Sequence, residues 1–126
     1  MLVRFDMDFN SEEALYIQLC NQIIRLIALE QIQEGEALPS VRSLAEEIGI
    51  NMHTVNKAYT VLKRDGFVKL DRRRGAVICL DADKYQAIQE LRQNLNVVLM
   101  RALCRNVTRE EVHQLVDEVF DRYEKR

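Results

Sequence analysis

Side chains that can bond the edges of DNA bases stand close together at residues 51–57. Thr54 offers a hydroxyl and a methyl group, Asn56 offers an amide, and Lys57 adds a positive charge. An asparagine can bond adenine through two hydrogen bonds, and a threonine methyl group can contact thymine. At the front of a helix such residues suit the major groove of double-stranded DNA, whereas the competing interpretation is an ordinary solvated helix. The candidate DNA-binding residues of this segment are Asn51, Met52, His53, Thr54, Asn56 and Lys57.

A second candidate for DNA contact is the basic run of Arg72, Arg73 and Arg74, which Gly75 follows. Three adjacent cations repel one another unless an anion lies close to them. The DNA backbone and the minor groove both supply negative charge. A solvated run of charges is the alternative, but the glycine and the apolar residues on both sides favour a turn that faces DNA.

The charge is unevenly distributed along the 126 residues, whose net charge is −2. Residues 38–78 hold eight Lys and Arg against four Asp and Glu, so this segment carries +4 and the remainder carries −6. A basic segment within an acidic chain focuses nucleic-acid binding on one part of the molecule.

Other kinds of site find little support in the sequence. Cys20, Cys79 and Cys104 are far apart and form no CxxC pair, so we expect three buried apolar residues and no metal site or disulfide. His53 has no second metal ligand nearby. The sequence shows no nucleophile with a base, no phosphate loop and no paired carboxylates, which argues against an enzyme and against a cofactor.

The sequence also argues against a membrane protein. No apolar run reaches the ~20 residues that span a bilayer. Residues 1–10 mix acidic and apolar residues and do not resemble a signal peptide. We therefore expect a cytoplasmic protein.

The candidate DNA-binding residues require two short helices around a tight turn. Ser40 is placed to cap a helix that runs to Ile48, and Gly49 can adopt the positive φ of the turn. Asn51 is placed to cap the next helix, which is expected to run to about Asp65. Apolar residues on both sides of 71–75 then predict a hairpin with a basic tip.

The residues before this segment predict an extended arm and a first helix. Apolar residues alternate from Val3 to Phe9, which favours an extended arm. Asn10 or Ser11 can cap the first helix, which carries an apolar stripe and fades by Gln33. Residues 37–39 are expected to form a short strand.

Residues 81–126 predict two further helices. Apolar residues recur at helical spacing from Tyr85 to Leu103 and from Val112 to Tyr123, and Thr108 starts a capping box. These stripes are too apolar for helices exposed to water, so we expect them to pair across a two-fold axis. The candidate dimer interface consists of Leu91, Leu95, Val98, Leu99, Leu115, Val119 and Phe120.

The predicted fold is therefore mainly α with a small β-hairpin. Residues 1–80 are expected to form a winged helix-turn-helix DNA-binding domain, and residues 81–126 a two-helix dimerisation tail.

Several motifs in this order resemble the DNA-binding domain of the GntR family of bacterial transcription regulators. They are Leu38-Pro-Ser-Val-Arg-Ser-Leu-Ala45, Gly49, Asn51, Thr54-Val55, Ala58-Tyr59, Leu62, Asp65-Gly66 and Arg74-Gly75. The resemblance covers Leu15 to Ile78, and the short tail looks like that of the YtrA-type subfamily, in which it serves dimerisation. The resemblance implies DNA contacts from Arg42, Asn51, His53, Thr54, Asn56, Arg74 and Gly75. Met52 and Asn56 stand where the family often has arginines, which predicts a different operator sequence.

The sequence thus predicts a homodimeric repressor that binds a pseudo-palindromic operator. The resemblance adds an expectation that it controls neighbouring transporter genes. The alternative is a winged-helix module that binds other proteins and not DNA, against which the three arginines weigh. An unknown small-molecule effector stays an open alternative to a protein without a ligand.

Overall fold

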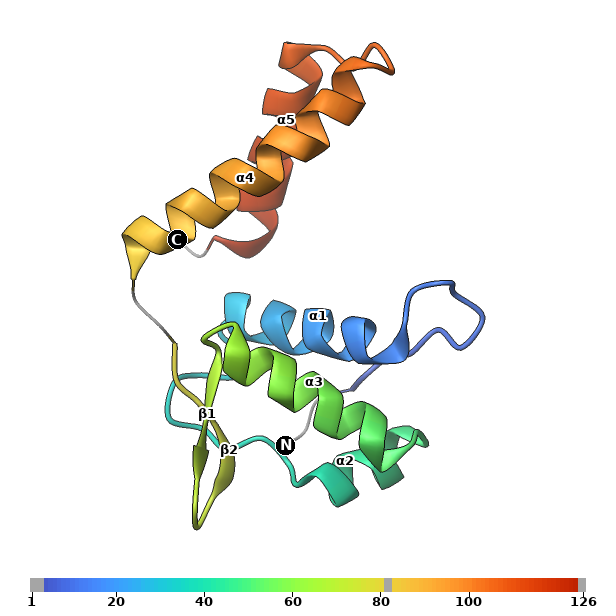
Figure 1. The fold of residues 1–126 in the computed structure, drawn as a ribbon, viewed down its shortest axis with the longest axis vertical. Helices are drawn as coiled ribbons and strands as arrows, with labels where there is room; N and C mark the ends of the chain where they lie inside the picture. The colour runs from blue at the N-terminus through green and yellow to red at the C-terminus, as the bar shows by residue number, and fades with distance from the viewer. Residues whose placement is uncertain (1–3, 81–82, 125–126) are drawn as a thin grey trace. The chain divides into compact units, whose positions relative to one another are not determined.

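The computed structural model describes residues 4–80 and 83–124. The chain forms two compact units, and the boundary between them falls between residues 81 and 82. In these described residues, the first unit holds α1 (Leu15–Ala28), α2 (Val41–Ile48), α3 (Met52–Arg64) and a hairpin of β1 (Val68–Asp71) and β2 (Gly75–Ile78). The second unit holds α4 (Lys84–Leu103) and α5 (Arg109–Tyr123) (Figure 1). The prediction of a mainly helical fold with a small hairpin is confirmed.

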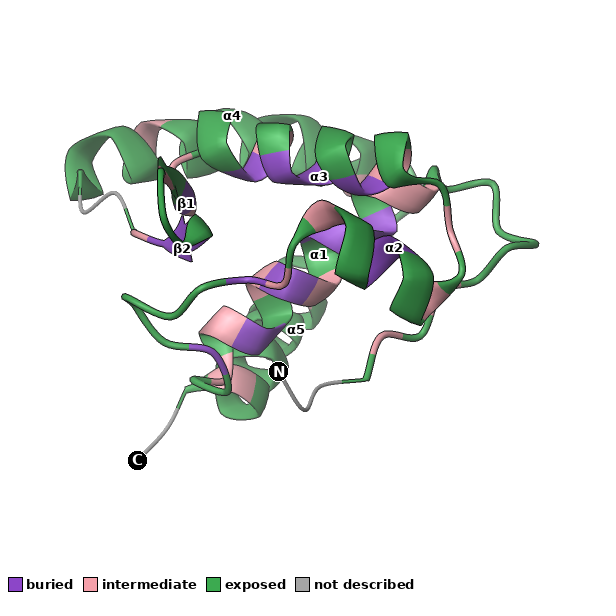
Figure 2. Cartoon of the chain, turned by 90° about the horizontal axis from the view of Figure 1, so that it is seen from below, coloured by how far each residue is buried: buried purple, intermediate pink, exposed green. Residues whose placement is uncertain are grey.

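The first unit has one hydrophobic core, to which its three helices and the hairpin all contribute. α3 lies beside α1 and also packs against α2 and β1. The largest side chains that are fully buried are Leu19, Ile23, Ile32, Leu44, Val55, Leu62 and Ile78. Figure 2 shows the buried positions on the faces that these elements turn toward one another. Burial of each such side chain contributes about 1.5–3 kcal/mol to folding.

The turn between α2 and α3 forms as its residue types predict. The Ser40 hydroxyl oxygen accepts a hydrogen bond of 3.1 Å from the Ser43 amide at the start of α2. Gly49 ends α2 with a φ of 81°, a conformation that costs residues with a Cβ atom more than glycine. The Asn51 side chain then accepts a bond of 2.7 Å from the His53 amide. Both caps and the turn are confirmed.

The predicted start of the first helix is wrong. α1 begins after Ala14, and no side chain caps it. The Ser11 hydroxyl accepts a hydrogen bond from the Glu13 amide, so it stabilises a local turn and not the helix. The Gln18 side chain donates to the carbonyl oxygens of Asp8 and Glu13, which holds residues 8–13 in this non-helical path. α1 also ends at Ala28, before the predicted end near Gln33.

The hairpin, which we call the wing, is held on both edges of β2. On one edge β2 pairs with β1 in antiparallel register, from Val68 opposite Ile78 to Asp71 opposite Gly75. On the other edge the Ile78 amide donates to the Glu36 carbonyl, and the Leu38 amide donates to the Ala76 carbonyl. The strand predicted at 37–39 is reduced to an isolated bridge between residues 37 and 77. The wing is therefore tied to the body of the first unit.

The second unit is a pair of helices with little core of its own. Thr108 and Glu111 form the predicted capping box: the Thr108 hydroxyl accepts from the Glu111 amide at 3.1 Å, and the Glu111 carboxylate accepts from the Thr108 amide at 2.9 Å. Asn106 makes the turn before it with a φ of 62°. Among the described residues, none of α4 or α5 is buried. No helix in the described residues is long and apolar enough to cross a membrane.

Candidate DNA interface

The first turns of α3 present several of the predicted DNA-binding residues together. Met52, His53 and Asn56 are exposed, and their spacing of three or four residues places them on neighbouring parts of one helix face. Thr54 is half-buried. The Asn51 oxygen caps the helix, so this residue positions α3 as well as lying at its front. The face can therefore offer a thioether, an imidazole and an amide to a ligand.

Lys57 lies at the edge of this face, beside α1. Its ammonium group stands 4.1 Å from the centre of the Tyr16 ring. A cation in this position is attracted by the ring by about 0.5–1 kcal/mol when the pair is exposed. Lys57 therefore has a partner within the first unit, the Tyr16 ring. The sequence predicted only a contact with DNA for this residue.

Arg42 is exposed in the first turn of α2. The Ser40 cap fixes the start of this helix two residues earlier, so the backbone from which Arg42 extends is well defined. A guanidinium on such a backbone suits bidentate contact with a guanine or a phosphate.

The tip of the wing is shaped by Asp71, a residue to which we assigned no role from the sequence. One of its carboxylate oxygens accepts hydrogen bonds from the Arg73 amide at 2.8 Å and the Arg74 amide at 3.0 Å. These two bonds lower the pKa of Asp71, because they favour its charged form. Gly75 closes the turn with a φ of 77°. The signal that could have identified Asp71 is an Asp at the first position of a tight turn.

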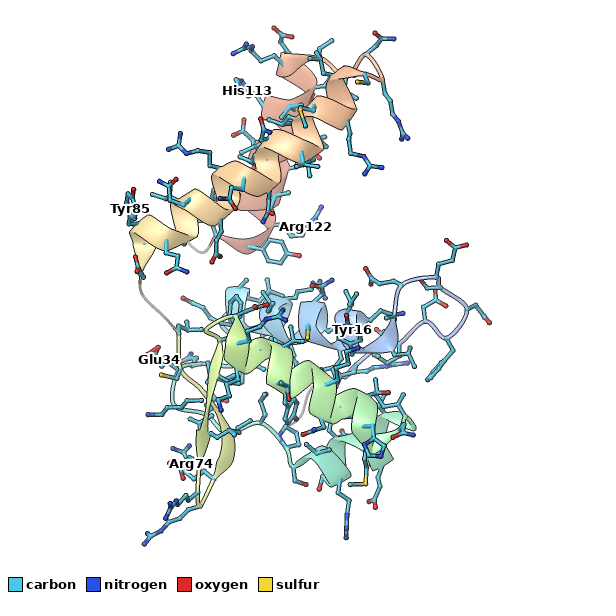
Figure 3. The ribbon with its side chains drawn as sticks, in the orientation of Figure 1. Tyr16, Glu34, Arg74, Tyr85, His113 and Arg122 are labelled. Carbon is cyan, nitrogen blue, oxygen red and sulfur yellow. The ribbon has the colours of Figure 1, made fainter. Side chains whose placement is uncertain are left out.

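The three adjacent arginines do not share one environment. Arg72 and Arg73 are exposed at the tip of the wing. Arg74, labelled on the wing in Figure 3, is exposed as well. Its guanidinium donates a hydrogen bond to the Gly35 carbonyl oxygen, in the turn that pairs with β2. Arg74 therefore links the wing to the 35–38 segment, whereas Arg72 and Arg73 extend from it.

A groove of about 480 Å³ lies between α3, the start of α2 and the wing. On its wall, the Tyr59 hydroxyl donates a hydrogen bond of 2.8 Å to the Pro39 carbonyl oxygen, which ties α3 to the segment before α2. The residues that line this groove are Leu38, Pro39, Ser40, Val41, Asn56, Tyr59, Thr60, Lys63, Leu70, Arg73, Arg74, Gly75 and Ala76. We call it the wing groove.

The wing groove brings together predicted and unpredicted residues. Asn56, Arg73, Arg74 and Gly75 belong to the predicted set, whereas Thr60 and Lys63 do not. Thr60 follows Asn56 by four residues and Lys63 follows Thr60 by three, so both continue the same face of α3. This spacing was a usable signal, but their place opposite the wing depends on tertiary packing.

The cysteines differ from the prediction of three buried residues. Cys20 is buried, its thiol lies 3.4 Å from the Ala58 carbonyl oxygen, and burial raises its pKa to about 11. Cys79 is half-buried and Cys104 is exposed, so the prediction is wrong for Cys104. Cys104 lies directly after α4, in the second unit, where no described residue is buried and no core is available to cover it. In residues 4–80 and 83–124, no three His, Cys, Asp or Glu residues form a group that could hold a metal ion.

The second unit exposes a large set of apolar side chains. The predicted interface residues Leu91, Leu95, Val98, Leu99, Leu115, Val119 and Phe120 are all between 37% and 59% exposed. Ile88, Leu103 and Val116 on the same two helices are exposed as well. Apolar surfaces of this kind occur where a protein binds another protein, a membrane or a ligand.

The winged unit has the sequence pattern of a known protein family. Residues 15–78 match the sequence profile of the bacterial regulatory proteins, gntR family. The chain belongs to the GntR family. It is 30% identical over 115 residues to the HTH-type transcriptional repressor YtrA of Bacillus subtilis (strain 168), which covers 89% of this chain and 88% of that protein.

Two solved structures extend this similarity over nearly the whole chain. YtrA from Sulfolobus acidocaldarius, a GntR-family transcription factor, is 34% identical with a TM-score of 0.59, over 95% of this chain and 99% of that chain. A transcriptional antiterminator from Listeria monocytogenes EGD-e is 30% identical with a TM-score of 0.82, over 93% of this chain and 90% of that chain.

Membership of the GntR family makes the chain a DNA-binding transcription regulator and not an enzyme. The two relatives named YtrA support the YtrA-type subfamily. The predicted family, subfamily and non-enzymatic class are confirmed.

Proposed function

We propose that the protein is a homodimeric repressor that binds a pseudo-palindromic DNA operator. The observation that carries this proposal is the division of the chain into a winged unit with an exposed basic tip and a helical unit with exposed apolar faces. The winged unit supplies the DNA contacts, and the helical unit supplies the contact between protomers. Two half-site contacts joined in one dimer bind more tightly than either contact alone.

In this proposal α3 enters the major groove. Met52, His53 and Asn56 face the bases, and Asn56 is suited to bond adenine. Arg42 contacts a guanine or a phosphate from the start of α2. Thr54 and Lys57 bind the backbone at the edges of α3, and the Lys57 ammonium leaves the Tyr16 ring to do so.

The wing makes the second set of DNA contacts. Arg72 and Arg73 extend toward the backbone or the adjacent minor groove, whose negative potential attracts arginine. Gly75 lets the backbone of the wing approach DNA closely because it lacks a Cβ atom. Arg74 either contacts DNA directly or holds the wing through its bond to the Gly35 carbonyl.

The proposed dimer is built from α4 and α5 of two protomers. Ile88, Leu91, Leu95, Val98 and Ala102 repeat at alternating spacings of three and four residues, which is the pattern of a coiled-coil seam. Pairing these seams, together with the apolar face of α5, would form a four-helix bundle. Two recognition helices would then reach successive major grooves, about 34 Å apart.

The repressor role rests on the relatives. The similar protein from Bacillus subtilis is named a transcriptional repressor. We extend the proposal to neighbouring transporter genes, following the resemblance to the YtrA type.

The dimer proposal is tested by a charge placed in the seam. Leu95→Asp should give monomers in multi-angle light scattering, because dimerisation would bury an unpaired carboxylate. Gln93→Asp adds the same charge two residues away, on the opposite side of α4, and should remain a dimer. Anisotropy titrations with a palindromic duplex should show the affinity loss in Leu95→Asp alone. A dimeric Leu95→Asp protein would contradict the proposed interface.

A further inference from the structure

The wing groove has a chemical character that base recognition does not explain. Its lining combines cations from two walls with apolar surface, and none of the described lining residues is acidic. Lys63 stands on the α3 wall, and Arg73 stands on the wing wall. Base edges present mixed donors and acceptors, whereas a sugar–phosphate backbone presents anionic oxygens beside apolar sugar C–H groups.

We propose that the wing groove holds the sugar–phosphate backbone of one DNA strand, and that Lys63 and Ser40 bind a phosphate there. This inference rests on the proposed DNA-binding function and adds two phosphate ligands to it. The strand in question runs between the major groove, which α3 enters, and the minor groove beside the wing.

The hydrogen bonds within the groove decide which side chains can donate to a phosphate. The Ser40 oxygen accepts from the Ser43 amide, so its own hydroxyl proton is left for an anionic acceptor. The Thr60 hydroxyl instead donates to the Asn56 carbonyl oxygen at 2.8 Å, so its proton is already used. Lys63 has three ammonium donors on a flexible stem and is exposed at the groove.

The apolar part of the groove fits the sugar. Leu70 lies on β1, two residues beyond the buried Val68, and is 64% exposed at the wing wall. Contact with apolar atoms of a ligand would remove part of this leucine from water, which is favourable in proportion to the apolar area buried. The deoxyribose C–H groups of the bound strand provide those atoms.

Both walls of the groove are held in place without DNA. The Tyr59 bond to the Pro39 carbonyl fixes the α3 wall to the start of α2. The Arg74 bond to the Gly35 carbonyl fixes the wing wall. Little reorganisation is then needed when a strand binds, which favours affinity.

The chain offers a closely matched control for Lys63. Arg64 is the next residue in the same last turn of α3, is exposed, and pairs with Asp65 at 3.1 Å. It does not line the wing groove. Lys63→Gln and Arg64→Gln remove the same charge, and both remove a cation from the C-terminal end of α3. A difference between them in DNA binding therefore reports position and not net charge.

The first test measures how the affinity for a selected operator duplex depends on salt concentration. Each phosphate contact contributes about 0.9 to the slope of log affinity against log salt. We expect Lys63→Gln to bind on the order of tenfold more weakly per lost contact at 0.1 M salt, with a slope shallower by about 0.9 for each half-site. Arg64→Gln and Lys63→Arg should keep the wild-type slope. Equal slopes for Lys63→Gln and Arg64→Gln would overturn the inference.

The second test locates the phosphate. Single phosphates of the duplex are replaced by neutral methylphosphonates, and binding is measured with the wild type and both variants. One replacement per half-site should weaken the wild type and Arg64→Gln more than it weakens Lys63→Gln, in which only Ser40 still binds that phosphate. If every replacement weakens all three proteins equally, Lys63 binds no phosphate. If the wild type binds no duplex specifically, the proposed function itself fails, which the equal-slope result would not imply.

Discussion

The Tyr59 hydroxyl donates a hydrogen bond of 2.8 Å to the carbonyl oxygen of Pro39, which lies 20 residues earlier in the chain. Tyr59 is 7% exposed, and burial raises its pKa, so the hydroxyl remains protonated and can donate across the ordinary pH range. The bond joins the recognition helix α3 to the residue before the cap of α2. It therefore sets the spacing between the two helices that carry Arg42 and Asn56.

Tyr59→Phe is expected to lower the free energy of unfolding by about 1 kcal/mol, because the Pro39 carbonyl loses its partner. Urea unfolding followed by circular dichroism measures the change. Tyr85→Phe is the control, since Tyr85 is 75% exposed on α4 and should change stability by less than about 0.5 kcal/mol. Equal stability of the two variants would show that the bond contributes nothing.

Gly49→Ala is expected to destabilise the first unit by about 1–2 kcal/mol, because alanine is strained at a φ of 81°. Apart from the two neighbouring residues in the chain, nothing lies within 4 Å of the added Cβ, so the cost arises from the backbone conformation and not from a clash. Glu47→Ala, an exposed position two residues earlier, is the control. Thermal unfolding should show a lower Tm for Gly49→Ala alone, and an unchanged Tm would contradict the left-handed turn.

Thr108→Ala is expected to shorten or fray α5, because the Glu111 amide loses its acceptor. The loss of such an N-cap costs about 1 kcal/mol. Thr108→Ser keeps the hydroxyl and should behave like the wild type. Hydrogen exchange of the amides in the first turn of α5 measures the effect. Unchanged protection in the alanine variant would mean that dimer packing, and not the cap, holds this end.

Acid should loosen the tip of the wing by protonating Asp71. The folded pKa of Asp71 is lowered, so its carboxylate stabilises the turn at pH values above its unfolded pKa. That stabilisation is lost as the pH falls through the lowered folded pKa. An NMR titration of the Asp71 carboxyl should give a midpoint below the usual range for aspartate, and a midpoint within that range would contradict the two amide bonds. In Asp71→Asn the turn should keep its acceptor and lose this pH dependence.

Local rules predicted the parts of the interface that depend on neighbouring residues. Ser40, Gly49 and Asn51 act within one helical turn of their own positions, so residue type was enough. The start of α1 was missed because Gln18 binds the carbonyl of Asp8 across ten residues and holds the preceding loop.

The remaining differences have the same physical origin. Lys57 meets Tyr16 from another helix, and Arg74 meets the Gly35 carbonyl from a distant turn. Lys63 lines a groove only because the wing lies opposite α3. Each of these depends on tertiary approach between segments, which periodicity and spacing do not specify. The apolar pattern of residues 85–123 did predict two helices. The apolar side chains that it placed on one face of each helix are exposed in the second unit.

The most direct test of the central claim is selection of bound duplexes from a random DNA library by the purified protein. A homodimeric regulator should enrich a two-fold symmetric site with half-sites about one helical turn apart. Arg42→Ala, which we expect to lose about 1–3 kcal/mol of binding free energy through a lost bidentate contact, should fail to enrich it. No enrichment by the wild type, even at low salt where backbone contacts are strongest, would contradict a homodimeric operator-binding regulator.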